Sequence, residues 1–159
     1  MPETLRVSLR PVTAADARRL WELRNEETVR RVSFGPEPIP FDRHQRWLAA
    51  RLTEAAAPMF MIDTPDTGDV GYVRFDAVEG ELHVSVALAP EARGRGLGPE
   101  ALRAAMHAVR ARGLRRPVLA LVRRDNARSL GAFLRAGFVP AGERAVGTAT
   151  ATALAWPDE

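Results

Sequence analysis

Three alternate glycines, Gly94, Gly96 and Gly98, stand where an apolar segment gives way to a helical one. Glycine allows backbone turns that point successive N–H groups toward one spot, and a helix N-terminus attracts an anion there. Pro99 follows at a position typical of the first turn of a helix. The segment therefore predicts a site for a phosphate or pyrophosphate group.

Two familiar nucleotide loops do not match this segment. The dinucleotide fingerprint would need glycine where Pro99 stands, and a P-loop would need Gly-Lys followed by Ser or Thr. A glycine-rich stretch that only makes a tight turn between two elements remains the alternative interpretation.

Charge is concentrated around the same glycines. Residues 91–128 hold ten Arg against three acidic residues, a local +7, while the rest holds thirteen Arg against seventeen, a local −4. Such a surface attracts anions. A nucleic acid would also use it, but no Phe, Trp or Tyr lies between residues 76 and 132 to stack on bases. We therefore expect no nucleic-acid partner.

Glu81 and His83 occupy alternate positions of an apolar and polar segment, residues 81–88. Histidine or a carboxylate tuned by its surroundings best removes a proton from an ammonium group near neutral pH. If residues 79 and 80 form a two-residue turn, Asp76 lies opposite His83 and could orient it. An ordinary solvated sheet face with an ion pair is the alternative.

These residues need strands and helices to position them. Alternating or short apolar runs predict strands at residues 5–10, 59–62, 70–75, 82–88, 118–122, 138–141 and 148–156. Helical spacing and capping residues predict helices over residues 13–24, 41–54, 99–112 and 126–136. The chain of 159 residues then reads as a single domain, 1–159, of α/β or α+β class with a mixed sheet.

Several classes of function are disfavoured by composition. The chain has no Cys, and its three His residues are scattered, so we expect neither disulfides nor a metal site. All 23 basic residues are Arg. No apolar run approaches the ~18 residues of a membrane span, and no secretory signal is recognisable, so we expect a cytoplasmic protein without a membrane partner.

A second motif, Asn126-x-x-Ser129, precedes an apolar helix that ends at Gly137-Phe138. Together with Arg93-x-x-Gly96-x-Gly98, the intervening helix and the strand, it resembles the acetyl-CoA-binding core of the GNAT family of N-acetyltransferases. The likeness covers roughly residues 70–140, and the order of elements is also similar. It implies a mixed, mostly antiparallel sheet of six to seven strands with about four helices, and acetyl-CoA as cosubstrate without a metal.

The resemblance also implies which residues bind the cosubstrate. Backbone groups would hold the pantetheine arm and acetyl carbonyl at Val86, Ala87 and Leu88. The pyrophosphate would lie on Arg93, Gly94, Arg95, Gly96, Leu97 and Gly98. Asn126 and Ser129 would line the far side of the pantetheine and sulfur beside Phe133, and Asn126 joins His83 and Glu81 among the catalytic candidates.

Phe133 is a departure from the family pattern. In many members a Tyr stands there, seven residues after the Asn, and is assigned as the acid that protonates the departing thiolate. The only Tyr of this chain is Tyr72, in a different element. Either another group or water protonates CoA here, or no acid is needed.

A weaker resemblance concerns the acceptor. The N-terminal half is similar to a GNAT subgroup that acts on amino-sugar nucleotides, which implies a small-molecule primary amine and acceptor contacts at Arg24, Asn25, His44, Trp47, Tyr72 and Arg74. The alternatives are a core role for Trp47 and a surface role for His44. Acetylation of protein N-termini and a non-catalytic CoA-binding sensor remain rival functions, and a homodimer is compatible with the family.

The expected mechanism is direct attack of the amine on the thioester with both substrates bound. A covalent acyl-enzyme needs an activated nucleophile, and the chain has no Cys, no Lys and no evident Ser-His pair at a strand-to-helix turn.

Overall fold

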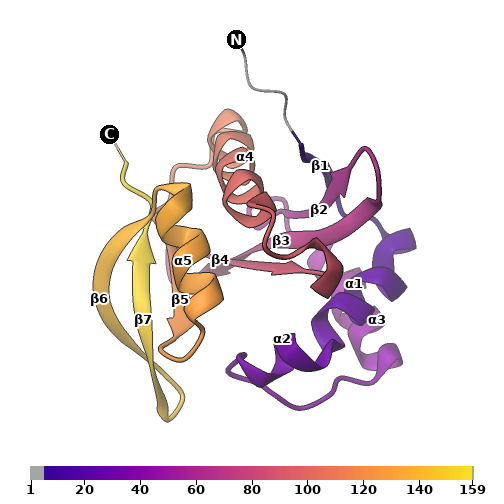
Figure 1. The fold of residues 1–159 in the computed structure, drawn as a ribbon, viewed down its shortest axis with the longest axis horizontal. Coiled ribbons are helices and arrows are strands. Elements are labelled where there is room, and N and C mark those ends of the chain that lie inside the picture. The colour runs from indigo at the N-terminus through magenta and orange to yellow at the C-terminus, as the bar shows by residue number, and fades with distance from the viewer. Residues whose placement is uncertain (1–5, 159) are drawn as a thin grey trace.

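A computed structural model describes residues 6–158 and contains one seven-stranded sheet, ordered β1-β2-β3-β4-β5-β7-β6 (Figure 1). The strands are β1 (Ser8–Pro11), β2 (Met59–Thr64), β3 (Gly68–Val78), β4 (Glu81–Leu88), β5 (Val118–Arg123), β6 (Val139–Val146) and β7 (Ala149–Ala155). The helices are α1 (Ala17–Asn25), α2 (Glu27–Arg31), α3 (Phe41–Arg51), α4 (Leu97–Ala111) and α5 (Ala127–Ala136). Only β4 and β5 pair in parallel, so the expected mixed, mostly antiparallel sheet is confirmed.

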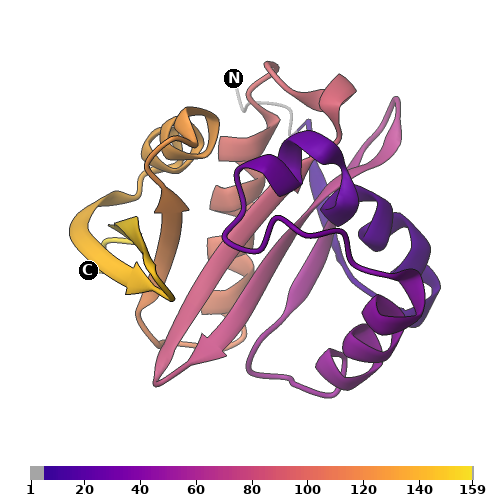
Figure 2. The same ribbon diagram turned by 90° about the horizontal axis from the view of Figure 1, so that it is seen from below.

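Both faces of the sheet are covered. Helices α1 to α3 lie over one face and α4 over the other (Figure 2). Strand β2 serves both layers, because successive side chains of a strand point to opposite faces: Met59 and Met61 join the cluster under α1 and α3, while Phe60 and Ile62 join the one under α4 and α5. The sheet therefore separates two apolar cores.

The sheet opens between β4 and β5. These strands pair only at Leu82 with Val118 and at His83 with Leu119, and β4 then continues to Leu88 without a partner on that side. Figure 2 shows β5 diverging from the long β3–β4 hairpin. Backbone groups of β4 that would complete a parallel ladder are thus left free along the opening.

The β3–β4 hairpin turns at Glu79 and Gly80, whose φ angles are +47° and +84°. Two left-handed residues in succession make the type I′ turn that matches the twist of paired strands. The register places Asp76 opposite His83. The predicted turn and pairing are therefore confirmed.

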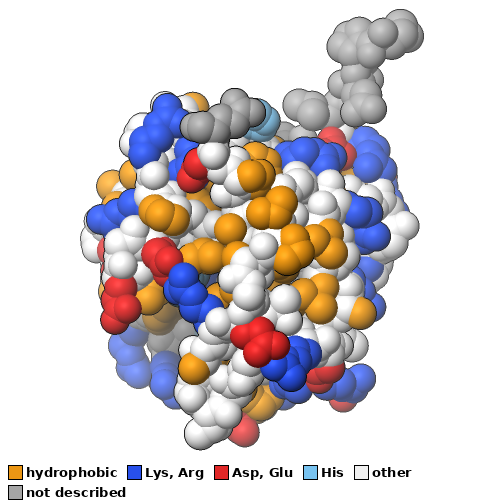
Figure 3. Space-filling model, turned by 90° about the vertical axis from the view of Figure 1, so that its left-hand side faces the viewer, with side chains coloured by type: hydrophobic (Ala, Val, Ile, Leu, Met, Phe, Trp, Pro, Cys, Tyr) orange, Lys and Arg blue, Asp and Glu red, His pale blue; other side chains and the backbone are white. Residues whose placement is uncertain are grey.

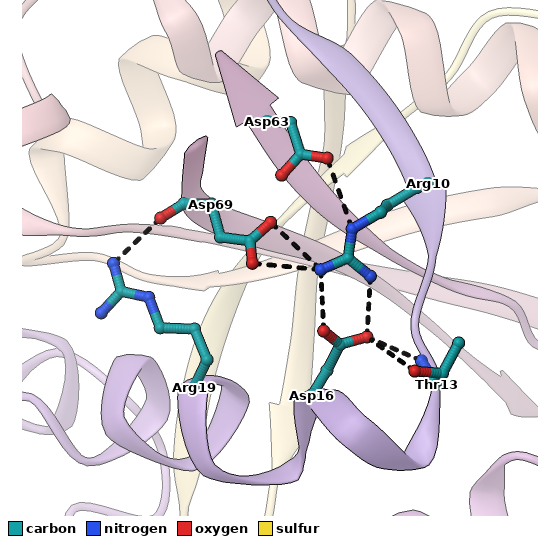
Figure 4. A network of polar contacts seen from close by, with 6 residues as sticks. All are labelled: Arg10, Thr13, Asp16, Arg19, Asp63 and Asp69. Atoms are coloured by element: carbon teal, nitrogen blue, oxygen red, sulfur yellow. Dashed lines mark hydrogen bonds and ion pairs between the residues drawn. The ribbon is translucent and has the colours of Figure 1, made fainter. Parts of the chain in front are cut away.

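An ion-pair network joins β1 to the start of α1 (Figure 4). The Arg10 guanidinium donates to Asp16 at 2.9 and 2.7 Å and to Asp69 at 3.1 and 3.0 Å, and it lies 3.4 Å from Asp63. Three carboxylates share one guanidinium, so their charges are not fully balanced. A hydrogen bond between Asp63 and Asp69, with burial and repulsion from Asp69, raises the pKa of Asp63 to about 6.

Two local features differ from the sequence-based expectation. The short helix α2 was not predicted; Glu26 caps it by accepting from the Val29 N–H. Helix α4 begins at Leu97 rather than at Pro99, with Gly96 as its N-cap residue. The first difference is a missed five-residue helix, and the second is a shift of a helix end, where one capping contact decides the boundary.

The edge strands of the sheet are β1 and β6, and β6 is exposed along nearly its whole length. The space-filling view of this side shows apolar side chains interspersed with charged ones (Figure 3). Among the described residues, no helix has the length and apolar character needed to cross a bilayer.

Candidate functional site

A cavity of about 300 Å³ lies at the opening between β4 and β5. The sequence-predicted residues that line it are Arg24, Tyr72, Arg74, Val86, Ala87, Leu88, Arg93, Gly98, Asn126, Ser129 and Phe133. Predicted residues outside its lining are Asn25, His44, Trp47, Glu81, His83, Gly94, Arg95, Gly96 and Leu97. The cavity thus brings residues from both halves of the chain to one place.

The glycine loop leads into the cavity at Gly98. Gly94 and Gly96 have φ angles of +77° and +75°, a conformation that side chains disfavour. Among residues 6–158, the N–H groups of Gly94, Arg95 and Gly96 have no hydrogen-bond acceptor, and the first N–H groups of a helix such as α4 have none within the helix. Loop and helix end therefore form a cradle of free donors that fits a pyrophosphate.

Side chains of this loop serve other purposes. Leu97 is 1% exposed and belongs to the core under α4, so only its backbone is available to a ligand. Arg95 is exposed and lies 3.5 Å from Asp66. A Cβ atom at Gly96 would lie 3.0 Å from Nη2 of Arg6.

Each nitrogen of the Arg93 guanidinium makes one contact within the protein. Its guanidinium donates to the Leu88 carbonyl at 3.2 Å, to Oγ1 of Thr28 at 2.7 Å and to Oε2 of Glu26 at 3.1 Å. Burial opposes ionisation of Glu26, but hydrogen bonds from Thr28 and Arg93 outweigh it and lower the Glu26 pKa to about 2. The side chain of Arg93 thus ties the glycine loop to α2, and its contact with the pyrophosphate stays a prediction.

Helix α5 supplies the opposite wall. Asn126 is its N-cap, and its Oδ1 accepts from the Ser129 N–H at 3.2 Å. This contact explains the Asn-x-x-Ser spacing, because an N-cap side chain reaches the N–H three residues on. Phe133 is 2% exposed and packs edge-on against Phe138 at 5.0 Å, which fixes the wall.

On the N-terminal side, Tyr72 and Arg74 of β3 face the cavity beside Ala87 and Ser85, their partners on β4. Arg74 is held by Asp76, which accepts from its Nε at 3.0 Å, and its guanidinium lies 5.5 Å from the Trp47 ring. Trp47 therefore acts as a platform for Arg74 and for the core under α1 and α3.

His44 and Asn25 lie behind this wall. His44 is 2% exposed, so it is not a surface residue, and neither ring nitrogen has a hydrogen-bond partner among the described residues. Burial, followed by the charges of Arg24 and Arg74, lowers its pKa and keeps the ring neutral. Asn25 exchanges two hydrogen bonds with the backbone of Ile39, at 2.7 and 3.0 Å, and so holds the loop before α3.

Glu81 and His83 lie at the start of β4, away from the cavity lining. Glu81 accepts two hydrogen bonds from Arg144, at 2.8 and 2.9 Å, and one contact from His83 at 3.1 Å; these lower its pKa to about 2. A carboxylate held this way is a weak base. Asp76 does not orient His83, as had been expected, because its oxygens are taken by Arg51 and Arg74. Both residues therefore lie outside the cavity lining, and their role as proton acceptors stays a prediction.

The charged side chains in the cavity lining are all arginines, and three of them pair with carboxylates outside the lining: Arg74 with Asp76, Arg93 with Glu26 and Arg123 with Asp125. Its lining contains five arginines and, among the described residues, no Asp, Glu or His; the arginines are Arg24, Arg74, Arg93, Arg123 and Arg128. Two of them, Arg123 and Arg128, were not singled out from the sequence, although they lie within the region of local +7. Counting charge located the region, but only the folded chain shows which guanidiniums reach the cavity.

A family model for the acetyltransferase (GNAT) domain matches residues 6–139. The chain belongs to the GNAT acetyltransferase family. This GNAT enzyme is accordingly an acetyl-CoA-dependent N-acetyltransferase, and its free donors and cavity fit that cosubstrate.

Similar proteins agree with the family. The chain is 28% identical over 144 residues to an L-methionine sulfoximine/L-methionine sulfone acetyltransferase of Pseudomonas paraeruginosa (strain DSM 24068 / PA7), covering 86% of this chain and 82% of that protein. A Bordetella pertussis protein described as a GnaT-family acetyltransferase is 25% identical with a TM-score of 0.77, over 98% of both chains. AAC(6')-Ib, solved with ribostamycin and coenzyme A, shares the fold at 18% identity and a TM-score of 0.79, over 94% and 92%.

Proposed function

We propose that this GNAT acetyltransferase acetylates the primary amine of a small molecule that also carries an anionic group. The observation that supports this proposal most directly is the lining of five arginines without a carboxylate among the described residues. A guanidinium binds carboxylate or phosphate well, whereas an amine flanked by further positive charges would be repelled.

Two arginines are assigned to the acceptor. Arg24 lines the cavity from the end of α1, and no acidic partner is found for it among residues 6–158. Arg74 is oriented by Asp76 and Trp47, which leaves the remaining nitrogens of its guanidinium for a ligand. Arg93 and Arg128 lie nearer the glycine loop and α5, where the phosphates of CoA would bind.

Similar proteins differ in the charge of their named acceptors. Ribostamycin and spermidine, named for two structural neighbours, are polycations, and a polycation favours a site with carboxylates. Methionine sulfoximine and methionine sulfone, named for the curated relative, carry a carboxylate next to the amine. The cavity suits the second kind of molecule.

An amino-sugar nucleotide is also an anionic amine and stays within the proposal, with Arg24 and Arg74 facing its phosphates. An amino acid derivative is the second candidate, favoured by the 28% identical relative. The amine would attack the thioester directly, because the cavity lining contains, among the described residues, no Cys or Lys and no His to activate one of its serines.

The deciding experiment measures CoA release with acetyl-CoA and five acceptor panels: amino-sugar nucleotides, amino acid sulfones and sulfoximines, polyamines, aminoglycosides, and N-terminal peptides. We expect turnover with one of the first two panels only. Turnover confined to polycations or peptides would overturn the anionic acceptor, and no turnover in any panel would favour the sensor function. Light scattering on the same sample tests the predicted homodimer.

A further inference from the structure

Among the described residues, the cavity lining contains few side chains that can give up and take back a proton. Its lining includes no Asp, Glu or His among the described residues, and the chain has no Cys and no Lys. Arginine does not lose its proton in proteins, and the hydroxyls of Ser and Thr are far weaker acids than a phenol. Tyr72, the only tyrosine of the chain, is the group that remains.

Tyr72 has a fixed place in the cavity wall. It lies in the middle of β3, opposite Ala87 of β4, and is 4% exposed. Its ring belongs to the apolar cluster that contains Leu20, Leu48 and Met61. Among residues 6–158 no hydrogen-bond partner is found for its hydroxyl, which leaves that group available to a ligand in the cavity.

Phe133 lines the same cavity from α5 and is itself 2% exposed. It carries no proton to donate. Strand β3 thus supplies a phenol to the cavity, and α5 supplies a phenyl ring. Of these two rings, only that of Tyr72 can donate a proton.

Resting on the proposed function, we propose that Tyr72 is the catalytic proton carrier of the acetyl transfer. The amine nitrogen forms the C–N bond to the acetyl carbon, and the C–S bond breaks with its electron pair on sulfur. The Tyr72 hydroxyl gives its proton to that sulfur. The phenolate then takes the proton that the acylated nitrogen releases, directly or through one water, which restores Tyr72.

The surrounding charge suits this cycle. Both the departing sulfur and the transient phenolate are negative, and the cavity wall presents Arg24 and Arg74 with no carboxylate among the described residues. Positive groups placed where negative charge develops lower the barrier. Starting from the neutral amine, the cycle needs no further acid or base, and the proton that the ammonium loses beforehand goes to solvent.

The first test does not depend on the acceptor. Because Tyr72 is the only tyrosine, the near-ultraviolet tyrosinate band reports its ionisation alone. We expect the pH midpoint of this band to move upward when CoA is bound, because the neighbouring thiol ionises first and its charge opposes a second one. S-methyl-CoA, which has no ionisable thiol, is the matched control. Equal midpoints in the two complexes would overturn the proposal.

The second test is kinetic and uses the best acceptor of the screen, whatever its charge. Tyr72→Phe keeps the ring and should lower kcat about a hundredfold or more, with KM for acetyl-CoA and the Kd for CoA unchanged. Adding Phe133→Tyr should restore part of kcat by supplying a phenol from α5. If Tyr72→Phe keeps the wild-type kcat, with or without a rise in KM, Tyr72 is a packing or binding residue and the proposal is wrong.

The outcomes separate the two proposals. A polycationic or peptide acceptor with a hundredfold kcat loss in Tyr72→Phe would overturn the anionic acceptor and leave the proton carrier standing. An anionic acceptor with unchanged kcat would do the reverse. No turnover with any acceptor would overturn both.

Discussion

The two walls of the cavity differ in the groups that they offer to a ligand: backbone groups on one side and charged side chains on the other. The wall that we propose for CoA consists of Gly98 and the apolar helix α5, and the free backbone N–H groups of Gly94 to Gly96 lie just before it, outside the lining. The wall that we propose for the acceptor carries two long side chains, Arg24 and Arg74, and Arg74 is held by the carboxylate of Asp76 and the ring of Trp47. A backbone cradle depends on glycine positions alone, whereas a side-chain wall depends on many tertiary contacts.

The largest effect is expected where the backbone wall is given a negative charge. Gly98→Glu should weaken acetyl-CoA binding about thirtyfold, roughly 2 kcal/mol, because a carboxylate near the pyrophosphate repels it. Gly98 suits this test better than Gly96, since its backbone is unstrained and a Cβ atom there meets Ala132 and Leu88 only at 3.7 Å.

The matched control is Gly98→Gln, which has nearly the same size without the charge. Calorimetric titration with acetyl-CoA should show little loss for Gln and a large loss for Glu. Equal losses in both variants would mean that bulk, not charge, matters at this position, and no loss in either would remove the loop from the binding site.

A smaller, selective effect is expected on the other wall. Arg24→Gln should raise KM for an anionic acceptor about tenfold, which corresponds to about 1.4 kcal/mol for a charged hydrogen bond. KM for acetyl-CoA should stay the same. Arg46→Gln, an exposed arginine of α3, is the control. A rise in KM for both substrates would show that the two walls are not independent at Arg24.

His44 makes the acceptor side sensitive to acid. Its pKa is lowered by burial, so below about pH 6.5, the ordinary histidine pKa, the unfolded chain takes up a proton that the folded chain cannot. Stability is therefore lost as pH falls below this value. In thermal melts from pH 7.5 to 5, His44→Leu should flatten this decline by a few degrees, whereas His107→Leu on α4 should follow the wild type.

The smallest effect is expected at Asp63, and it has the opposite sign. Its pKa is raised to about 6, so the folded chain binds a proton more tightly than the unfolded one, and stability falls as pH rises from about 4 through 6. Asp63→Asn should raise Tm at pH 7.5 by roughly 2–4 °C, about 1 kcal/mol after solvent screening. At pH 4 the gain should vanish. Asp42→Asn, exposed on α3, should change neither value.

The contrast between the walls also explains what could be predicted from the sequence. The β3–β4 turn at Glu79 and Gly80, the glycine loop and the Asn126 cap are local: each is determined by residues within a few positions of one another, so spacing alone identifies them. The helices and strands followed from the same kind of signal, whereas the number of strands and their mostly antiparallel arrangement came from the resemblance to the GNAT family. Most errors were confined to element ends, where α2 and the start of α4 depend on single caps.

The acceptor side resisted prediction because its side chains are placed by distant partners. Whether His44 is exposed depends on how α3 packs, and the availability of Asp76 depends on Arg51, twenty-five positions earlier. Glu81 looked like a free carboxylate until β6 brought Arg144 beside it. Residue type and alternation cannot reveal such contacts, since they join positions far apart in the chain.

Arg93 connects the two walls of the cavity through its hydrogen bonds. One guanidinium holds the Leu88 carbonyl on β4 together with Thr28 and Glu26 at α2. Any shift of this side chain loosens both walls at once, so changes on either side that move it cannot have additive effects. The stabilities of the two walls are therefore coupled through Arg93, although one wall offers backbone groups and the other offers side chains.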